Sequence, residues 1–521
     1  MGSPSFVRSA GLVSACILLS RILGFVRDVL CSHFFGAGMA WDMFVVAFRI
    51  PNLFRRLFGE GALTAAFLPA FVDRAEGGRT EEARGLLSRL VGALGLLLSA
   101  LVAVGIGITY LLPGDPENAL LARLLRIMLP YLGLICVAAI LGAALNGLRH
   151  FFTPAIAPAL LNVVWIAALF AFAGNIEAVA WAVLLGGAVE LLVMLPALGR
   201  RKMLAVPRLE LRDPALREVG AQFLPLVFGL ALVQINEAVG SVIAKEMVPG
   251  DGAVSAIYYG NQLVQLPLAL IGTAMATAVF PLFTSPREAF EDVFQKSLRV
   301  VLFLAVPATV GLMVMARPLV ELLFEHGAFK PEATGRAAGV VTLYAAGLWC
   351  FCANQIQARA FYAKKDTRTP VKVSATMVFL NLGLSLALVG PLGEKGIAIA
   401  SSASGLGTFL ALNVLLRRRF PAVDLRPAYG AFLRSALAAL LMGAAAWGAS
   451  RLMGAVEGAT IGPKLARALV PVAAGALAYA LLARLLLKDE LLLLRRPHED
   501  RRVPGADPPD LPRPGPEAGA R

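Results

Sequence analysis

Long apolar segments separated by short polar loops run along almost the whole chain. Each is about as long as the 20 or so helical residues that cross the hydrocarbon core of a bilayer, and the alternation typical of a transmembrane β-barrel is missing. The chain has 521 residues, 58% of them hydrophobic, and its mean hydropathy of +0.73 is too high for a water-soluble surface. We therefore predict an all-α polytopic membrane protein with about fourteen transmembrane helices. Their expected ranges are 8–31, 40–70, 86–112, 122–147, 154–174, 178–198, 218–246, 254–283, 294–324, 334–362, 369–390, 395–416, 429–453 and 464–487.

The positive charge of the chain, +14 in total, is concentrated in alternate loops. The loop after the sixth segment carries Arg200, Arg201 and Lys202, and residues 417–419 after the twelfth are all arginine, whereas the loop after the first segment has no Lys or Arg. Cytoplasmic loops of membrane proteins are enriched in these residues, so we expect both termini to lie in the cytoplasm. The same pattern explains the charge without a nucleic-acid partner, because no soluble basic domain is present to bind one.

An internal repeat divides the chain. GALTAAFLPAF at 61–71 resembles GTAMATAVFPLF at 272–283, and NGLRHFFTPAIAPALLN at 146–162 resembles YAKKDTRTPVKVSATMVFLN at 362–381. Both matches have nearly the same offset, which spans six helices, so the two copies have the same orientation in the membrane. This predicts two parallel six-helix lobes related by an axis along the membrane normal, with the substrate site between them.

The repeat and the composition define four expected regions. The chain end is rich in Pro and charge and has few apolar residues to bury, which predicts disorder. The regions are an N-terminal lobe at 1–200, a second lobe at 201–420, two extra transmembrane helices at 421–487, and a disordered cytoplasmic tail at 488–521.

One stretch, residues 20–61, carries charges where membrane helices usually have none. A charge at the centre of such a helix costs about 2.5–3.5 kcal/mol on insertion scales, so these side chains should face a watery cavity, one another or a ligand. Five arginines outnumber three acids, and a guanidinium binds phosphate through two parallel hydrogen bonds. The pattern favours a pyrophosphate ligand, although some of the arginines are equally well explained as boundary residues or ion-pair members. The charged residues are Arg21, Arg27, Asp28, Asp42, Arg49, Arg55, Arg56 and Glu60.

The same stretch carries a family resemblance. The run SRILGFVRDVLCSHFFGAGMAWDMFVVAFRIPNLFRRLFGEGALTAAFLPAF at 20–71 resembles the signature of the MurJ (MviN) lipid II flippases, and FYAKKDTRTPVKV at 361–373 is similar to the same family. The resemblance implies a fold of the multidrug/oligosaccharidyl-lipid/polysaccharide exporter superfamily in the bacterial cytoplasmic (inner) membrane. It also implies a substrate, undecaprenyl-pyrophosphate carrying the disaccharide-pentapeptide of peptidoglycan, which moves to the periplasmic leaflet by alternating access.

The resemblance also assigns roles to residues. It implies that Arg21, Arg27, Arg55 and Asp42 line the central cavity, and that the last two helices form a groove for the lipid tail. We expect Glu60 to position these arginines or to contact the headgroup, together with Asp42. A wider set of expected cavity residues is Ser20, Asp28, Arg49, Arg56, Gln262 and Gln265.

The chain departs from the family at two sites. In the eighth helix the family commonly has an arginine, often followed three residues later by a glutamate, where this chain has Gln262 and Gln265. The cavity therefore loses one positive charge, and binding of the pyrophosphate depends more on the first lobe.

The second departure concerns a sodium site that some members build from carboxylates between the seventh and eleventh helices. The matching positions here are Gly240, Asn381 and Ser385, which puts sodium coupling in doubt. Glu237 and Asn381 are the candidate coupling residues, and a buried, neutral or paired Glu237 is the alternative.

The sequence shows no catalytic or cofactor-binding motif in addition to this site. The chain has no G-x-x-x-x-G-K-[ST] loop, no paired metal ligands and no nucleophile–base constellation, and its five cysteines lack zinc or redox spacing. We expect a transporter, not an enzyme, with no cofactor; its partners are lipid II and membrane lipids, with cell-wall synthesis proteins as further candidates. The alternatives are an exporter of another polyprenyl-pyrophosphate-linked saccharide, a membrane glycosyltransferase and a non-catalytic scaffold.

Overall fold

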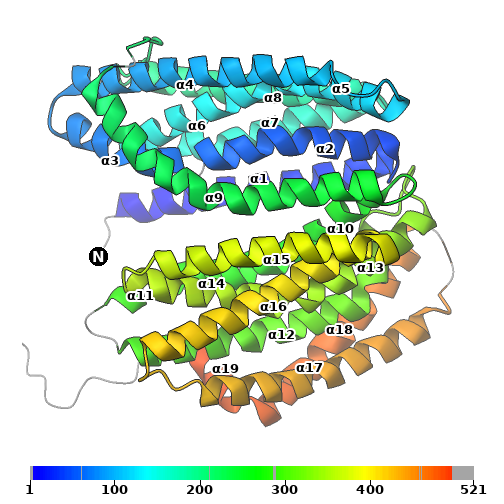
Figure 1. The fold of residues 1–521 in the computed structure, drawn as a ribbon. Coiled ribbons are helices and arrows are strands. Elements are labelled where there is room, and N and C mark those ends of the chain that lie inside the picture. Colours follow the sequence, from blue (N-terminus) through cyan, green and yellow to red (C-terminus); the bar gives the residue numbers. More distant parts are fainter. Residues whose placement is uncertain are drawn as a thin grey trace, which may run out of the picture.

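The computed structural model describes residues 4–59, 62–210, 212–285, 289–456, 458 and 460–495, and all regular structure in these ranges is helical. The helices lie side by side as two groups, with a further pair on the outer side of the second group (Figure 1). In the first group they are α1 (Pro4–Phe35), α2 (Met39–Phe54), the π-helix η1 (Arg55–Gly59), α3 (Ala62–Glu76), α4 (Thr80–Thr109), α5 (Pro116–Met128), α6 (Tyr131–Gly147), α7 (Phe152–Ala171) and α8 (Ile176–Gly199).

The second group repeats this order. Its helices are α9 (Pro214–Met247), α10 (Ala253–Pro267), the π-helix η2 (Leu268–Thr273), α11 (Ala274–Thr284), α12 (Phe290–Leu323), α13 (Pro331–Ala346), α14 (Leu348–Ala363), α15 (Arg368–Leu392) and α16 (Glu394–Arg419). The chain then continues with α17 (Arg426–Met453), α18 (Ile461–Leu486) and the short α19 (Lys488–Arg495).

The two groups share their irregularities as well as their order. In each, a π-helical segment follows the second helix close after a proline, Pro51 in the first group and Pro267 in the second. In each, the helix pair α5–α6 or α13–α14 is interrupted between its halves, and α13 and α14 are bent by 41° at Gly347. The all-helical fold class is therefore confirmed, and the repeated order of the helices agrees with the predicted division into two lobes, which stays a prediction.

The structure supports fewer spans than the fourteen predicted. Within the described residues, each of the fourteen expected ranges overlaps one or more helices of the structure. Among the described residues, ten helical ranges are long and apolar enough to cross a membrane, or eleven when the bent pair α13–α14 is taken as one span. Fourteen therefore stays a prediction.

Helix α9 joins the two groups. It packs against α2 and α3 of the first group and against α15 of the second, and Figure 1 shows it between them. Asp213 caps its first turn by accepting from the backbone N–H groups of Ala215 and Leu216, which are donors that a helix cannot satisfy internally. The sequence assigned α9 to the second lobe, and the structure gives it contacts with both.

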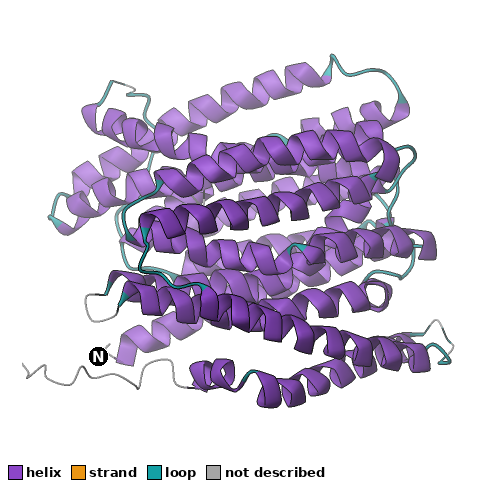
Figure 2. Cartoon of the chain, turned by 60° about the horizontal axis from the view of Figure 1, so that its bottom comes forward, coloured by secondary structure: helices purple, strands orange, loops and turns teal. Residues whose placement is uncertain are grey.

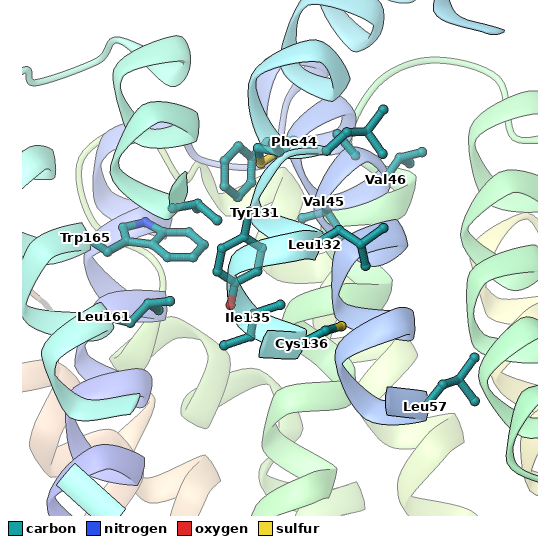
Figure 3. Close-up of a cluster of buried hydrophobic side chains, with 14 of the residues drawn as sticks. Phe44, Val45, Val46, Leu57, Tyr131, Leu132, Ile135, Cys136, Leu161 and Trp165 are labelled. Atoms are coloured by element: carbon teal, nitrogen blue, oxygen red, sulfur yellow. The ribbon is translucent and has the colours of Figure 1, made fainter. Parts of the chain in front are cut away.

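The interior of the first lobe is built around aromatic rings. Phe44 of α2 packs edge-on against Trp165 of α7, with 5.4 Å between ring centroids, and Tyr131 and Leu132 of α6 complete the cluster in Figure 3. Aromatic pairs in this geometry contribute about 0.5–1.5 kcal/mol beyond their buried area. The cluster fixes α2, α6 and α7 around the position of Trp165, which matters for the site described below.

The C-terminal helices are tied to the second lobe by ion pairs at both ends of α18. At one end, Glu490 of α19 is fully buried and accepts from Arg299 of α12 at 2.7 Å and from Arg434 of α17 at 3.1 Å. At the other end, Arg467 of α18 pairs with Glu321 of α12 at 2.6 Å. Figure 2 shows helices joined by loops, with no strand among the described residues.

The start of the expected disordered tail differs from the structure. Residues 488–495, within the range predicted to be disordered, form α19, because burial of Glu490 and packing of Leu491 against α12 and α18 stabilise this turn of helix. The rest of the predicted tail, 496–521, lies outside the described residues.

We predict that Glu490→Gln lowers the thermal stability of the full chain in detergent. The substitution keeps the shape but removes the charge that Arg299 and Arg434 share, and losing a hydrogen bond to a charged group costs about 1.5–3 kcal/mol. Thermal unfolding followed by circular dichroism measures this loss. Asp489→Asn is the control, because the Asp489 side chain is 67% exposed and lies 3.9 Å from Arg299; equal midpoints for the two variants would contradict the prediction.

Candidate functional site

The guanidinium of Arg27 in α1 is held on three sides. Its Nε and NH2 donate to Asp28 Oδ1 at 3.1 and 2.8 Å, and its NH1 donates to Asn162 Oδ1 of α7 at 3.0 Å. The ring of Trp165 faces the same group, with 4.4 Å from Arg27 Cζ to the ring centroid. The side chain keeps 14% of its surface exposed. A buried cation is thus compensated by a carboxylate, an amide and an aromatic face.

Asp28 connects this cluster to the second lobe. Its side chain is 2% exposed. Besides Arg27, it accepts hydrogen bonds from the Tyr258 hydroxyl at 2.9 Å and from the side-chain amide of Gln262, both on α10. The structure therefore brings together three of the predicted cavity residues, Arg27, Asp28 and Gln262, and places them where the two lobes meet.

Asp42 forms the second contact between the lobes. Its carboxylate accepts from the backbone N–H groups of Gly252 and Ser255, both at 2.7 Å, and from the Ser255 hydroxyl, so it caps the first turn of α10. Gly252 has φ = 90°, and a Cβ there would lie 2.8 Å from the carbonyl oxygen of Ala37, so glycine is required. Asp42 is buried, and its hydrogen bonds connect the first lobe to the second.

The arginines of α2 and η1 lie farther along the same helix. Arg55 Nε donates to Asn52 Oδ1 at 3.1 Å, and Arg56 NH1 donates to Gln234 Oε1 of α9 at 3.2 Å. Arg49, Asn52 and Gln234 line a small cavity of about 20 Å³ between α2 and α9. The π-helical turn after Pro51 places Arg55 and Arg56 here, because it adds a residue to the local helical repeat.

Ser20 and Arg21 sit on the half of α1 that precedes Arg27. The backbone carbonyl of Ser20 accepts from Asn162 Nδ2 at 3.2 Å, while the Arg21 side chain is exposed. Asn162 therefore bridges Ser20 and Arg27 and fixes two turns of α1 against α7.

The remaining predicted residues are not brought to the Arg27 cluster. Gln265 is exposed on α10. Asn381 Nδ2 donates to the Ser401 hydroxyl at 3.3 Å, within the second lobe. Glu60 lies outside the described residues, as does the side chain of Glu237, whose backbone belongs to α9. Across the described residues, no three His, Cys, Asp or Glu side chains gather closely enough to hold a metal ion.

Sequence reasoning missed the residues that complete the site. Asn162, Trp165, Tyr258 and Ser255 contact the charged groups directly. A single asparagine within the apolar run ALLNVVWIAALF was an available signal, because polar groups inside membrane helices are rare and usually paired. Tyr258 and Ser255 carry no such signal, since both residue types are common in helices of this kind.

A family model described as "Lipid II flippase MurJ" matches residues 31–460. This range includes Asp42, Arg55 and the first turn of α10, and it begins just after Arg27 and Asp28.

Related chains and structures agree with this match. A probable lipid II flippase MurJ of Vibrio cholerae is 33% identical over 440 residues, 80% of this chain and 83% of that protein. A lipid II flippase MurJ of Burkholderia cenocepacia is 33% identical over 429 residues, covering 78% and 83% of the two chains.

Solved structures support the fold. A lipid II flippase MurJ in an inward closed conformation matches with a TM-score of 0.77 and 24% identity over 92% of this chain and 99% of that one. An inward-facing multidrug resistance MATE family transporter of the MOP superfamily matches with a TM-score of 0.65 and 14% identity over 80% and 98%. With a family model matched over residues 31–460 and relatives one-third identical over about four-fifths of its length, this chain belongs to the MurJ family of lipid II flippases.

Proposed function

We propose that this protein is a transporter that moves lipid II from the cytoplasmic to the outer leaflet of the bacterial inner membrane by alternating access of its two lobes. The observation that carries the proposal is the partly buried guanidinium of Arg27 where the lobes meet, which contacts Asp28, Asn162 and Trp165. The relatives carry the name of this activity, and a multi-pass helical fold suits it. No covalent step is involved.

Asp28 and the substrate compete for Arg27. In the closed arrangement the carboxylate of Asp28 neutralises the guanidinium, so the lobes can meet without burying an unpaired charge, which would cost several kcal/mol. A pyrophosphate offers more charge and more acceptor oxygens than one carboxylate, and it binds a guanidinium through two parallel bonds. When it takes over Arg27, Asp28 must reorganise, and its bonds to Tyr258 and Gln262 change with it. Headgroup binding is thereby linked to the contact between the lobes.

The other arginines extend the site along α2. Arg55 and Arg56 donate to the amide oxygens of Asn52 and Gln234, which are weaker acceptors than a phosphate. We assign Arg55 and Arg56 to binding of the pyrophosphate on its way to Arg27, because a guanidinium binds phosphate through two parallel hydrogen bonds. Arg21, on the exposed half of α1, is assigned to the entry side of the same path. Glu60 stays a proposed contact of the headgroup.

The lipid tail is assigned to the outer surface of α17 and α18. These helices expose a row of leucines, among them Leu433, Leu440 and Leu477, each more than 60% exposed, as lipid-facing positions are. Both ends of the pair lie against the second lobe, and the charge pattern of the loops supports cytoplasmic termini. Enzymes of cell-wall synthesis are the partners we propose to receive the product.

We predict that Arg27→Ala strongly reduces lipid II exposure on the periplasmic face of cells depleted of their own flippase. Loss of the two hydrogen bonds between the guanidinium and the pyrophosphate weakens substrate binding by about 1.5–3 kcal/mol. This corresponds to roughly a tenfold to hundredfold loss of transport. Arg27→Lys keeps the positive charge but cannot form two parallel hydrogen bonds, so its transport should lie between that of the unsubstituted protein and that of Arg27→Ala. Lipid II accessible to an external probe is measured at equal membrane abundance.

Arg84→Ala is the matched control, because Arg84 pairs with Glu81 on an exposed face of α4. If Arg27→Ala transports lipid II as well as the control does, Arg27 is not part of the binding site, although the proposed function still holds. No transport by the unsubstituted, correctly inserted protein would refute lipid II as substrate and favour another polyprenyl-pyrophosphate-linked saccharide.

We also predict that Asp42→Asn opens the lobes at the end where α10 begins. The asparagine loses the charge and turns a donor toward the backbone N–H groups of Gly252 or Ser255. Charge-assisted bonds contribute about 1.5–3 kcal/mol, so the ratio of closed to open molecules should fall at least tenfold. Spin labels at Gly114→Cys and Gly335→Cys, where no side chain crowds either glycine, report the distance between the lobes.

Asp115→Asn provides the control for this measurement. Asp115 caps α5 within the first lobe, where the Asn118 side chain and backbone hold the pKa of its carboxyl below the ordinary value. The five native cysteines are buried, so labelling is confined to the introduced ones. An unchanged distance distribution for Asp42→Asn, or an equal change for the control, would show that Asp42 does not hold the lobes together.

A further inference from the structure

A second cavity lies at the end of the bundle opposite α19, away from the Arg27 cluster. It has a volume of about 530 Å³ and is formed by the end of α1, the loop between α12 and α13, and the first turn of α18. Its lining includes five titratable side chains: His33, Glu325, His326, Lys330 and Lys464. The proposed orientation places it at the extracytoplasmic face. Nothing in the transport path described above uses it.

The walls of this cavity are fixed by contacts between the lobes. The backbone N–H of Ala328 donates to the carbonyl of His33 at 2.8 Å. The Ser32 hydroxyl donates to the carbonyl of Phe324 at 3.2 Å. Gly327 has φ = 58°, and a Cβ there would lie 2.4 Å from the His33 carbonyl oxygen. The loop therefore fits α1 closely, and the cavity exists as a preformed site when the lobes are together.

The one carboxylate that the described residues place at the cavity is already engaged. Glu325 Oε2 accepts from the Thr334 hydroxyl at 2.6 Å, and Oε1 pairs with Lys464 Nζ at 3.4 Å. Nζ also donates to the Glu325 carbonyl, so the Lys464 side chain, only 4% exposed, is held rigidly with its charge at the cavity wall. Glu325 thus orients a cation and does not present a free anion to a ligand.

The donors that remain suit an oxyanion. Lys330 is exposed at the cavity and is the N-cap residue of α13, whose first turn has no side-chain cap, and a helix N-terminus favours negative charge. His326 Nε2 donates to the Leu322 carbonyl at 2.8 Å, which fixes the ring, so Nδ1 becomes a further donor only when the ring binds an anion as imidazolium. His33 lines the cavity from α1. Two lysines, two imidazoles and a helix N-terminus surround a space large enough for a phosphate group.

We propose that this cavity binds an oxyanion of the phosphate class and, by touching α1, the α12–α13 loop and α18 at once, holds the lobes closed at this end. The ligand favours the arrangement in which the substrate path opens to the other side. The phosphate comes from the headgroup of an anionic lipid in the outer leaflet or from free phosphate or pyrophosphate, which share this chemistry. The proposal depends on the proposed orientation and not on the identity of the transported lipid.

The first test titrates inorganic phosphate and pyrophosphate into the purified full chain in detergent and follows the heat of binding. Saturable binding is expected, and the double variant Lys330→Gln/His326→Gln should bind at least tenfold more weakly. Lys395→Gln, an exposed lysine at the start of α16 on the same end, is the matched control and should bind as the unsubstituted chain does. Lys464 is kept, because removing it would leave Glu325 without its cation.

The second test separates the two sources. The spin-labelled pair at Gly114 and Gly335 is measured in nanodiscs of phosphatidylcholine and of phosphatidylglycerol, with and without added phosphate. A closed population that increases with phosphatidylglycerol and no longer responds to phosphate assigns the site to a lipid headgroup; an equal response to phosphate in both lipids assigns it to free phosphate. Absence of both effects in the unsubstituted chain, or equal binding by the double variant, overturns the proposal.

Discussion

The carboxylate of Asp42 at the first turn of α10 is the interaction on which the arrangement of the two lobes depends. Three donors converge on it, two of them backbone N–H groups at the positive end of a helix. The turn that presents these donors needs glycine at position 252, where φ is positive and a Cβ would clash with the carbonyl oxygen of Ala37, between α1 and α2. Once α10 is held in this way, Tyr258 and Gln262 reach Asp28 one and two turns farther along, and Asp28 in turn holds Arg27.

Electroneutrality explains why the cluster can close without substrate. One guanidinium and one carboxylate face each other, and the hydrogen-bond partners that the described residues add at the centre, Asn162, Tyr258 and Gln262, are neutral. An arginine in place of Gln262, as the family resemblance would suggest, would leave a second cation next to a single acid in a nearly dry interface. The glutamine keeps the contact with Asp28 while removing that excess charge. The departure from the family is therefore compatible with a well-closed unloaded state, and it leaves Arg27 as the central cation of the site.

The sequence predicted the helices well because hydrophobic runs of membrane-spanning length determine them locally, and it marked Arg27 and Asp28 because charge in such a run is costly. It could not predict that Asp42 caps α10, because the two are more than 200 residues apart and only packing brings them together. The π-helical turns after Pro51 and Pro267 could not be predicted from the sequence either, because their formation depends on packing against neighbouring helices. The helix at 488–495 was missed because KDELLLLR is short, and its structure depends on burying Glu490 between two arginines of other helices.

The ion pairs at both ends of α18 determine how the proposed tail groove moves. Glu490 joins α19 to Arg299 of α12 and Arg434 of α17, and at the far end Lys464 and Arg467 pair with Glu325 and Glu321 beside the end of α12. A helix pair fixed to α12 at two points about the length of a membrane apart cannot tilt independently of it. The pair α17–α18 should then travel with the second lobe, so a lipid tail lying on it keeps its distance from that lobe throughout the cycle. In the proposed cycle, a headgroup bound by α1 and α2 of the first lobe moves relative to its own tail as the lobes separate. The flexible prenyl chain has to absorb that motion, which suits a ligand whose long hydrocarbon remains in the bilayer while only its polar end passes between the lobes.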